Sequence, residues 1–313
     1  MTNNKKLKIY LNKISEDWII DRTSKEWYRE NNSISTKYQH RSNAIWIIAP
    51  WTWNKLNKKN LENKKVLCSI YHIDEEKFDR KAQDDFKFRD HFVDEYHVIS
   101  KNTERQIKKI TNKKITTLPF WINTNIWFDI ANKNLVKEKY KLDQSDFYIG
   151  SFQRDSEGSD LNKPKLSKGP DRFVEIVLGL NKEIKNLHVL ITGKRRNYII
   201  NELTDKGIKF SYFEMLDFES LNELYNCLDL YIVASRYEGG PQAILECGIT
   251  KTPIISTDVG IAKEILASES IFDMSNYAQA EPNIEIAYKN SQEISMLKMF
   301  PKYIKMFEDL IES

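Results

Sequence analysis

The amino-acid sequence predicts an α/β protein built from two Rossmann-like domains. Short apolar runs alternate with longer amphipathic stretches along the chain, which is typical of βα units that build parallel sheets. With 313 residues, the chain is long enough for two domains of ordinary size. Its 41% hydrophobic residues and seven tryptophans supply enough apolar surface for two cores.

The first domain is predicted to span residues 1–142. Its expected strands are Leu7–Leu11, Ala44–Ala49, Val66–Ile70, Tyr96–Ser100 and Ile115–Leu118. Its expected helices are Asp17–Asn31 and Thr103–Thr111. Residues 123–146 are rich in Asn and Lys and poor in strand formers, so the boundary between the domains is placed in this segment.

The second domain is predicted to span residues 143–290. Its expected strands are Phe147–Phe152, His188–Thr192, Ile208–Phe213, Leu228–Ala234, Pro253–Ser256 and Ser270–Phe272. Its expected helices are Pro170–Leu180, Asn197–Lys206, Ser220–Cys227 and Pro241–Ile249. Residues 291–313 carry a last helix, Ile294–Glu312, which we expect to pack back toward the first domain.

The most informative segment is 235–246, which reads SRYEGGPQAILE and follows an apolar, buried-type strand. Gly239 and Gly240 permit a sharp turn without side chains, and Pro241 suits the first position of the following helix. A glycine-rich turn at a helix N-terminus is a ready anion site, because backbone N–H groups and the positive end of the helix dipole converge there.

Two carboxylates flank this turn. Glu238 lies at its mouth, and Glu246 lies about two helical turns further along and on the same side. On the residues alone, a surface loop followed by an ordinary helical glutamate is the alternative interpretation. This Glu–x7–Glu pattern resembles the motif of retaining glycosyltransferases with the GT-B fold, especially glycosyltransferase family 4, the group 1 glycosyltransferases.

The resemblance implies two Rossmann-like domains that face each other across a cleft, with ligand loops at the carboxyl ends of the strands. It implies that Glu238 is a catalytic residue beside the donor sugar. It also implies that Glu246 binds the ribose hydroxyls of the nucleotide. Gly239, Gly240 and Pro241 then belong to the donor-binding turn.

The same resemblance assigns a clamp for the donor diphosphate. Arg154 follows the first strand of the second domain, and Lys168 precedes that domain's first helix. In the family, an Arg and a Lys at these places bind the diphosphate, and their charges stabilise the leaving group without a metal. The segment between them is longer than usual and contains Lys163 and Lys165, which compete with Lys168 for this role.

Two further turns follow the next strands. The resemblance places Gly193, which opens Gly193–Arg196, beneath the nucleotide. The three consecutive cations after Gly193 either add a phosphate contact or form a solvated basic turn. The turn Phe213–Asp217 matches the place where the family's backbone reads the edge of the base.

In the first half, His72 follows the strand Val66–Ile70. Members of the family commonly carry a histidine at this strand end, where it contacts the transferred sugar, so His72 is the second candidate catalytic residue. A structural histidine is the alternative. Asp74 is a candidate contact for the acceptor hydroxyl.

The first domain departs from the family pattern because it is shortened. Its first strand is followed by residues 12–18, which contain no glycine, whereas the family has a glycine-rich loop here. Acceptor recognition is therefore the least defined function of the chain. Trp46, Trp51 and Trp53 either pack in the core, line an acceptor cleft or touch a bilayer interface.

Charge and composition limit the partners. Residues 1–150 hold 29 Lys and Arg against 20 Asp and Glu, whereas residues 151–313 hold 19 against 25. The basic first half suits an anionic acceptor or an anionic membrane surface, with a solvated lysine-rich face as the plain alternative. No known nucleic-acid module is visible, so nucleic acid is not an expected partner.

Targeting features are absent from the sequence. No apolar run approaches the ~20 residues of a transmembrane helix, and no apolar region of the secretory type follows the N-terminus. Cys68, Cys227 and Cys247 lie in apolar stretches without metal-ligand spacing, which indicates buried free thiols. We therefore expect a cytoplasmic protein whose membrane contact, if it has one, is peripheral at the inner membrane surface.

The sequence thus predicts a metal-independent, retaining glycosyltransferase of the hexosyltransferase type. It would transfer a sugar from a nucleoside-diphosphate sugar, its donor substrate, to a hydroxyl of a glycan, lipid-linked or other acceptor, with no cofactor. A metal-dependent GT-A enzyme is disfavoured because no Asp-x-Asp motif lies at a strand end. Hydride transfer is disfavoured because the motif Gly-x-Gly-x-x-Gly is missing. The alternatives are a GT-B sugar-nucleotide epimerase or phosphorylase, and a non-catalytic sugar-nucleotide-binding subunit.

Overall fold

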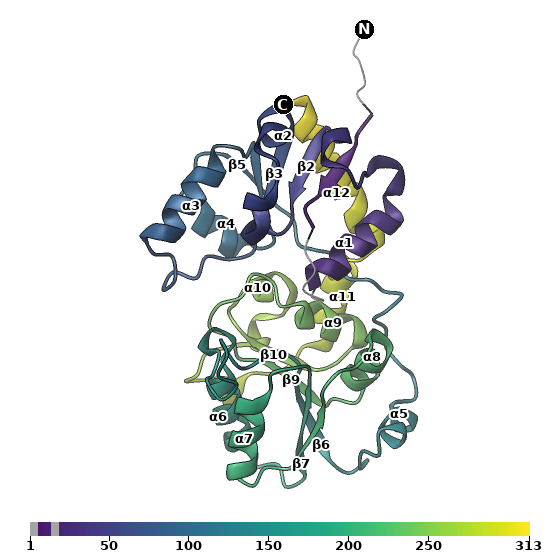
Figure 1. The fold of residues 1–313 in the computed structure, drawn as a ribbon. Coiled ribbons are helices and arrows are strands. Elements are labelled where there is room, and N and C mark those ends of the chain that lie inside the picture. The colour runs from purple at the N-terminus through teal and green to yellow at the C-terminus, as the bar shows by residue number, and fades with distance from the viewer. Residues whose placement is uncertain (1–5, 14–18) are drawn as a thin grey trace. The chain divides into compact units, whose positions relative to one another are not determined.

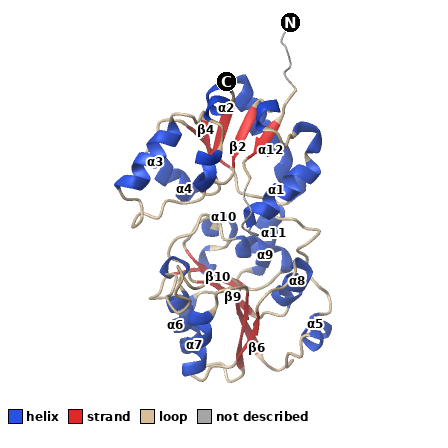
Figure 2. Cartoon of the chain, in the orientation of Figure 1, coloured by secondary structure: helices blue, strands red, loops and turns tan. Residues whose placement is uncertain are grey.

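The computed structural model describes residues 6–13 and 19–313, and these form two compact units (Figures 1 and 2). Unit 1 comprises residues 1–120 together with 297–313, and unit 2 comprises residues 121–296. The chain therefore changes units after Phe120, whereas the sequence analysis placed the boundary after residue 142. The start of the helix expected from Asp17, and most of the glycine-free segment 12–18, lie outside the described residues.

The described residues of unit 1 form one parallel sheet in which the strands follow each other in sequence order. These strands are β1 (Ile9–Leu11), β2 (Ala44–Ile47), β3 (Lys65–Ile70), β4 (Glu95–Val98) and β5 (Lys114–Thr117). The helices are α1 (Ile19–Glu30), α2 (Lys58–Asn63), α3 (Arg80–Asp90), α4 (Lys101–Ile107) and α12 (Met296–Glu312). Every predicted strand of the first half is present, with ends shifted by a few residues.

Helices cover both faces of the unit 1 sheet. On one face, Ile45, Val66 and Tyr96 of the sheet share a core cluster with Phe86 of α3 and Ile107 of α4. On the other face, the indole of Trp46 packs against Trp27 of α1 and against Tyr303 and Phe307 of α12. Aromatic pairs of this kind add about 0.5–1.5 kcal/mol each beyond the burial of their area. The last helix of the chain therefore belongs to the core of unit 1.

Unit 2 contains a doubly wound parallel sheet with the strand order β11-β10-β9-β6-β7-β8. Its strands are β6 (Phe147–Ser151), β7 (Leu187–Thr192), β8 (Phe210–Phe213), β9 (Leu230–Val233), β10 (Ile254–Thr257) and β11 (Ile271–Phe272). The order reverses between β6 and β9, which pair directly. In sheets of this kind, ligands bind at the carboxyl ends of the strands beside such a switch point.

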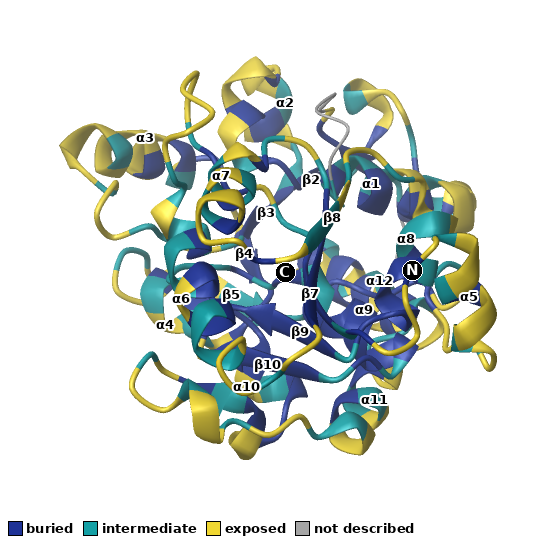
Figure 3. Cartoon of the chain, turned by 90° about the horizontal axis from the view of Figure 1, so that it is seen from below, coloured by how far each residue is buried: buried dark blue, intermediate teal, exposed yellow. Residues whose placement is uncertain are grey.

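The helices of unit 2 lie on both faces of its sheet. They are α5 (Lys133–Lys139), α6 (Pro170–Leu180), α7 (Asn197–Asp205), α8 (Phe218–Asn226), α9 (Gln242–Thr250), α10 (Ala262–Ile265) and α11 (Ile284–Gln292). One core cluster joins α6 and α7 to the sheet, and a second joins α8 and α9 to it. The inner strands of this sheet are deeply buried, as Figure 3 shows for β7, β9 and β10, whereas the edge strand β8 is partly exposed.

Side-chain caps explain where several helices begin. Asp79, Ser100, Asp217 and Asn283 each precede a helix and accept a hydrogen bond from a backbone N–H in its first turn. Caps of this type stabilise a helix by about 1 kcal/mol. The first three mark α3, α4 and α8, and the last marks α11. Helices α2, α3, α5, α10 and α11 were not predicted from the sequence.

The cysteine prediction is confirmed, since Cys68, Cys227 and Cys247 are all free and buried. None of the helices in the described residues is both long enough and apolar enough to cross a membrane.

Candidate active site

The strongest site candidates of unit 2 gather at the carboxyl ends of β6 and β9. Gln153 and Arg154 follow β6, and the segment 235–240 follows β9. The two loops are neighbours because β6 and β9 pair in the sheet. Their contact is direct, since the Gln153 amide donates to Ser235 Oγ at 3.4 Å. The predicted motif therefore lies at the switch point of the sheet.

Glu238 and Lys168 form an ion pair at this place. Ser235 Oγ also donates to Glu238 Oε1 at 3.3 Å, and the Gln153 amide donates to the Lys168 carbonyl at 2.9 Å. The side chain of Glu238 is only 9% exposed, whereas that of Lys168 is 22% exposed. A solvated loop glutamate does not have these surroundings. The interpretation of Glu238 as a solvated residue of a surface loop is therefore wrong.

Two glycines hold the segment 235–240 in place by close backbone contact. Gly169 has φ +63°, and a Cβ there would overlap the carbonyl of Ala234. Gly260 has φ +53°, and a Cβ there would overlap the Gly239 carbonyl and lie 2.9 Å from the Gly240 nitrogen. Only glycine meets both requirements, left-handed backbone and lack of a side chain. The segment 235–240 is thus fixed at both of its ends.

A second set of contacts fastens the same segment to the start of α6. Arg236 makes two hydrogen bonds to the Asp171 carboxylate, at 2.8 and 2.6 Å. The backbone N–H groups of Arg236 and Tyr237 both donate to the Ser167 carbonyl, at 2.9 and 3.1 Å. Two-pronged Arg–carboxylate pairs are geometrically specific. This arrangement explains why Lys168, just before α6, lies next to Glu238.

Pro241 and the helix start differ from the sequence analysis by one residue. Pro241 is the N-cap residue of α9, and the helix begins at Gln242 rather than at Pro241. Pro241 has a φ of −58° and a ψ of 114°, so its backbone is still outside the helix. Gly239 and Gly240 are not among the described glycines with positive φ. It is the backbone of these two residues that Gly260 approaches closely.

Glu246 lies in α9 and is buried. Its Oε2 atom accepts a hydrogen bond of 2.8 Å from the phenol of Tyr225 in α8. Burial, and then the Glu246 charge, raise the pKa of Tyr225 well above its ordinary value, so this phenol stays protonated as a donor. The sequence analysis did not identify Tyr225, because nothing in the local pattern links α8 to the glutamate motif.

The cations of the predicted diphosphate clamp are close to one another. Arg154 is exposed, Lys168 is half-buried, and Lys165 is half-buried between them. Burial, and then the nearby charges of Arg154 and Lys168, together lower the pKa of Lys165 to about 8. The other competitor for the lysine role, Lys163, is exposed.

The turn after β7 has one residue in an unexpected role. Gly193 has φ +92°, and a Cβ there would lie 4.0 Å from the Phe152 carbonyl oxygen. Its place beneath the nucleotide stays a prediction. Arg196, however, is fully buried and neither contacts solvent nor lies in a solvated basic turn. Its Nε donates to Asp155 at 3.1 Å, and its Nη1 to the carbonyls of Ser151 and Thr192. For Arg196, the solvated-turn interpretation is therefore wrong, whereas an added phosphate contact from this turn stays a prediction.

In unit 1, His72 is exposed directly after β3, at the carboxyl end of that strand. Asp74 forms an ion pair of 3.8 Å with Lys77. Another histidine of unit 1, His97, is buried and bonded to Ser69 Oγ at 2.8 Å and to the Leu118 carbonyl at 2.7 Å, which gives it a structural role.

The three tryptophans of this region have different surroundings. Trp46 and Trp53 are buried in the two cores of unit 1, as core packing predicts. Trp51 has 46% of its surface exposed and lies beside Tyr71. Of the three, only Trp51 has an exposed surface that a ligand or a bilayer could contact.

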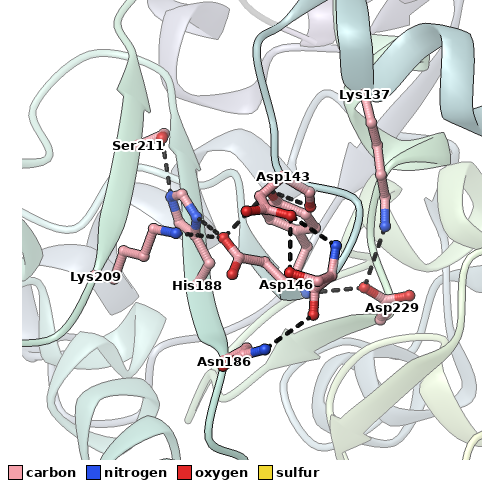
Figure 4. A network of polar contacts seen from close by, with 10 residues as sticks. Lys137, Asp143, Asp146, Asn186, His188, Lys209, Ser211 and Asp229 are labelled. Carbon is pink, nitrogen blue, oxygen red and sulfur yellow. Dashed lines mark hydrogen bonds and ion pairs between the residues drawn. The ribbon is translucent and has the colours of Figure 1, made fainter.

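A polar network surrounds Asp146 at the amino ends of the unit 2 strands, opposite the ends that carry Glu238 (Figure 4). Asp146 Oδ2 binds His188 Nδ1 at 2.9 Å and the Lys209 ammonium at 2.5 Å. His188 Nε2 in turn binds Ser211 at 2.9 Å. Asp146, Lys209 and Asp229 each come directly before a strand, so the network ties the amino ends of the strands together. It is therefore far from the loops that carry Glu238.

Residues 163–305 match the family described as glycosyl transferases group 1. A protein of Sulfolobus islandicus rod-shaped virus 1 without a known function is 22% identical over 280 residues, which are 85% of this chain and 75% of that protein. The lipopolysaccharide core biosynthesis mannosyltransferase LpsB of Rhizobium meliloti is 24% identical over 162 residues. That match spans 50% of this chain and 44% of LpsB.

Solved structures with the same fold cover nearly the whole chain. HepE from Anabaena, in complex with UDP and glucose, has a TM-score of 0.73 at 10% identity, over 97% of this chain and 100% of that one. Sucrose-phosphate synthase from Thermosynechococcus elongatus has a TM-score of 0.69 at 14% identity, over 96% of this chain and 81% of that one. The fold is therefore GT-B, as the sequence predicted.

Proposed function

We propose that this chain, whose residues 163–305 match the group 1 glycosyl transferases, is a retaining, metal-independent glycosyltransferase that uses a nucleoside-diphosphate sugar. The proposed acceptor is a hydroxyl of a glycan or of a lipid-linked sugar. The titles of the HepE structures, which name UDP, glucose and UDP-glucose, support a nucleotide sugar as the donor. The name of LpsB supports a saccharide acceptor.

The observation that carries this proposal is the pair of Glu238 and Lys168 at the switch point of the unit 2 sheet. Its two members have opposite charges and lie beside the glycine turn that begins α9. A donor needs both charges at one place. The lysine would stabilise the diphosphate as it leaves, and the carboxylate would face the anomeric carbon as positive charge develops there.

Each remaining residue has a part in the same proposal. Arg154 would share the diphosphate with Lys168, because Arg and Lys charges can stabilise a leaving phosphate without a metal. The N–H groups at Gly239 and Gly240 would add the positive end of the α9 dipole. Glu246, held by Tyr225, would accept both ribose hydroxyls. His72 of unit 1 would contact the transferred sugar.

A basic N-terminal half supports a second element of the proposal, contact with an anionic acceptor or membrane surface at the cytoplasmic side. This contact would be peripheral. Binding of purified protein to vesicles with and without phosphatidylserine tests it. Equal binding to both kinds of vesicle would remove membrane charge from the proposal.

The experiment that tests the function begins with a thermal-shift screen of UDP-, GDP- and ADP-sugars. A ligand at 100 times its dissociation constant stabilises the fold by roughly 2.7 kcal/mol, so the donor should stand out. Transfer to candidate acceptors is then followed by product mass, and the anomeric configuration of the product by NMR. An inverted product would contradict retention. Binding with neither transfer nor hydrolysis would indicate the non-catalytic subunit, and an altered nucleotide sugar would indicate an epimerase.

Glu246→Ala separates the nucleotide contact from the rest of the site. The loss of a charged hydrogen bond costs about 1.5–3 kcal/mol, so affinity for the donor and for the nucleoside diphosphate should both fall on the order of 10- to 100-fold. Unchanged affinity in a folded variant would show that Glu246 does not bind the ribose.

A further inference from the structure

The long segment between Arg154 and Lys168 is a short hairpin rather than a free loop. The Glu157 N–H donates to the Lys163 carbonyl at 3.0 Å, and the Lys165 N–H donates to the Asp155 carbonyl at 2.7 Å. Ser156 and Pro164 form an antiparallel bridge between these two bonds. Lys165 therefore lies at the base of the hairpin, opposite Asp155.

The base of this hairpin is anchored in the body of unit 2. Asp155 and Ser156 are buried, and Asp155 pairs with the buried Arg196. Ser156 Oγ donates to the Arg195 carbonyl at 3.0 Å, and the Asp155 N–H donates to the same carbonyl at 3.3 Å. A lysine attached to such a base has a fixed backbone position, whereas Lys163, nearer the tip, is exposed.

Two backbone hydrogen bonds bring three cations together. Arg154 immediately precedes Asp155, whose carbonyl binds the N–H of Lys165. The carbonyl of Lys165 in turn accepts the N–H of Lys168 at 2.8 Å, across the 3₁₀ turn Leu166–Lys168. Residues three apart in a 3₁₀ turn lie above one another on the same side. The insertion thus adds a third positive charge to the predicted diphosphate clamp.

Lys165 differs from its neighbours in its anionic partners. The ammonium of Lys168 is paired with Glu238. Within residues 6–13 and 19–313, the half-buried ammonium of Lys165 makes no hydrogen bond or ion pair. A partly buried charge without a partner is unfavourable unless an anion reaches it. The charges that act on it come from Arg154, Lys168, Glu238 and Glu157.

We propose that Lys165 is a third diphosphate ligand of this enzyme, supplied by the hairpin and acting together with Arg154 and Lys168. This inference rests on the proposed function, because it needs a nucleoside diphosphate at the switch point. The role of Lys165 would be to keep a cation on the leaving diphosphate even while Lys168 is shared with Glu238. Its loss should therefore weaken binding of the diphosphate.

The experiment measures the affinity of whichever of UDP, GDP and ADP binds the wild-type protein most tightly, by titration calorimetry at pH 7.5. Lys165→Ala should weaken binding on the order of 10-fold, whereas Lys165→Arg should stay within about threefold of wild type. Lys163→Ala, which removes an exposed lysine from the same hairpin, is the matched control and should change little. Thermal unfolding of each variant confirms that it is folded.

A pH series gives a readout that a merely structural role would not produce. Since the pKa of Lys165 is lowered to about 8, its charge is lost as pH rises through this value in the free protein. Diphosphate affinity of the wild type should be constant from pH 7 to 7.5 and fall between pH 8 and 9.5. Lys165→Arg keeps its charge throughout, so its affinity should not fall in this range.

The outcomes separate this inference from the proposed function. If the wild type binds none of the three diphosphates, both fail together. If the wild type binds and Glu246→Ala weakens binding, but Lys165→Ala behaves like Lys163→Ala, only the inference about Lys165 is overturned. Weaker binding by Lys165→Ala together with a flat pH profile for Lys165→Arg supports it.

Discussion

The phenol of Tyr225 donates a hydrogen bond of 2.8 Å to the carboxylate of Glu246, and both side chains are buried. The two residues come from neighbouring helices, α8 and α9. A carboxylate held in this way keeps one oxygen bound to the protein and a fixed orientation for the other. Tyr225 is therefore a positioning residue for the proposed ribose contact.

Tyr225→Phe should weaken nucleoside diphosphate binding by roughly 3- to 10-fold, because the buried carboxylate loses a donor worth about 1 kcal/mol. The unfolding free energy should fall by a similar amount. Tyr148→Phe is the control, since the phenol of this buried tyrosine donates a part-buried hydrogen bond to the Asp143 carbonyl at 2.9 Å, at the opposite end of the strands. Calorimetry and denaturant unfolding check both variants. Equal loss of affinity in the two variants would contradict the positioning role.

Glu238→Gln should lower turnover by roughly 10²-fold, about 2.7 kcal/mol of transition-state stabilisation. Glutamine keeps the shape of the side chain but removes the negative charge beside the anomeric carbon. Nucleoside diphosphate affinity should not fall, because the variant also frees Lys168 from its ion pair. Initial rates and calorimetry measure the two quantities separately.

The matched control for this variant is Glu219→Gln, which changes an exposed glutamate of α8 and should alter neither quantity noticeably. A Glu238→Gln enzyme with full turnover, or one whose only defect is weak nucleotide binding, would exclude a role at the sugar.

Removal of divalent metal should leave transfer within about twofold of its normal rate, because cations and backbone N–H groups take the role of a metal at the diphosphate. Rates before and after EDTA treatment and desalting are compared. Loss of activity that Mn²⁺ or Mg²⁺ restores would refute metal independence.

Gly260→Ala should reduce stability by about 3 kcal/mol or more and reduce donor binding as well. The new Cβ would combine a left-handed backbone with overlap against the Gly239 carbonyl. Gly207→Ala is the control, since Gly207 also has positive φ but has nothing within 4 Å of its Cβ position. Gly207→Ala should reduce the stability of the fold by only ~1–2 kcal/mol, the cost of a left-handed backbone at alanine, and should leave donor binding unchanged. If the two variants behave alike, Gly260 does not support the donor-binding turn.

Acid should destabilise unit 1 partly through His97. Burial lowers its pKa from 6.5 to about 4, so between these values the unfolded chain takes up a proton that the folded protein excludes. The unfolding free energy should therefore fall as pH is lowered from 6.5 to 4, by roughly 3 kcal/mol at most for this group. In the His97→Gln variant, the unfolding free energy should depend less on pH over that range. The control variant His91→Gln, which changes an exposed residue, should keep the pH dependence of the wild type. Denaturant unfolding at each pH measures this difference.

Most strands were predictable because they are short apolar runs that are buried on both sides, as Val66–Ile70 and Leu228–Ala234 illustrate. Helix α3 was not assigned, since Phe86 and Arg89 are its only buried residues and most of its other side chains are charged. Helix α5 buries only Val136. Such helices have no apolar stripe, and they depend on packing and caps that a local pattern does not reveal.

In the site, the sequence identified residues whose roles depend on a local motif, such as Glu238 beside its glycine turn. It could not identify partners that are distant in the chain. Arg196 pairs with Asp155, 41 residues earlier, and Tyr225 reaches Glu246 from another helix. A run of cations such as Lys194–Arg196 does not reveal that its last member is buried, because that depends on a carboxylate supplied by another loop.

The placement of α12 sets the order in which the protein can finish folding. All five strands of unit 1 precede unit 2 in the chain, but Tyr303 and Phe307, which cover Trp46, come after it. During synthesis, the ribosome must make residues 121–296 before this cover exists, which takes roughly 10–40 seconds at ~5–20 residues per second. For that time, one aromatic face of the nascent sheet has no covering helix from α12. The unit that is synthesised first is therefore completed last, and a chaperone that shields aromatic surface would act in this interval.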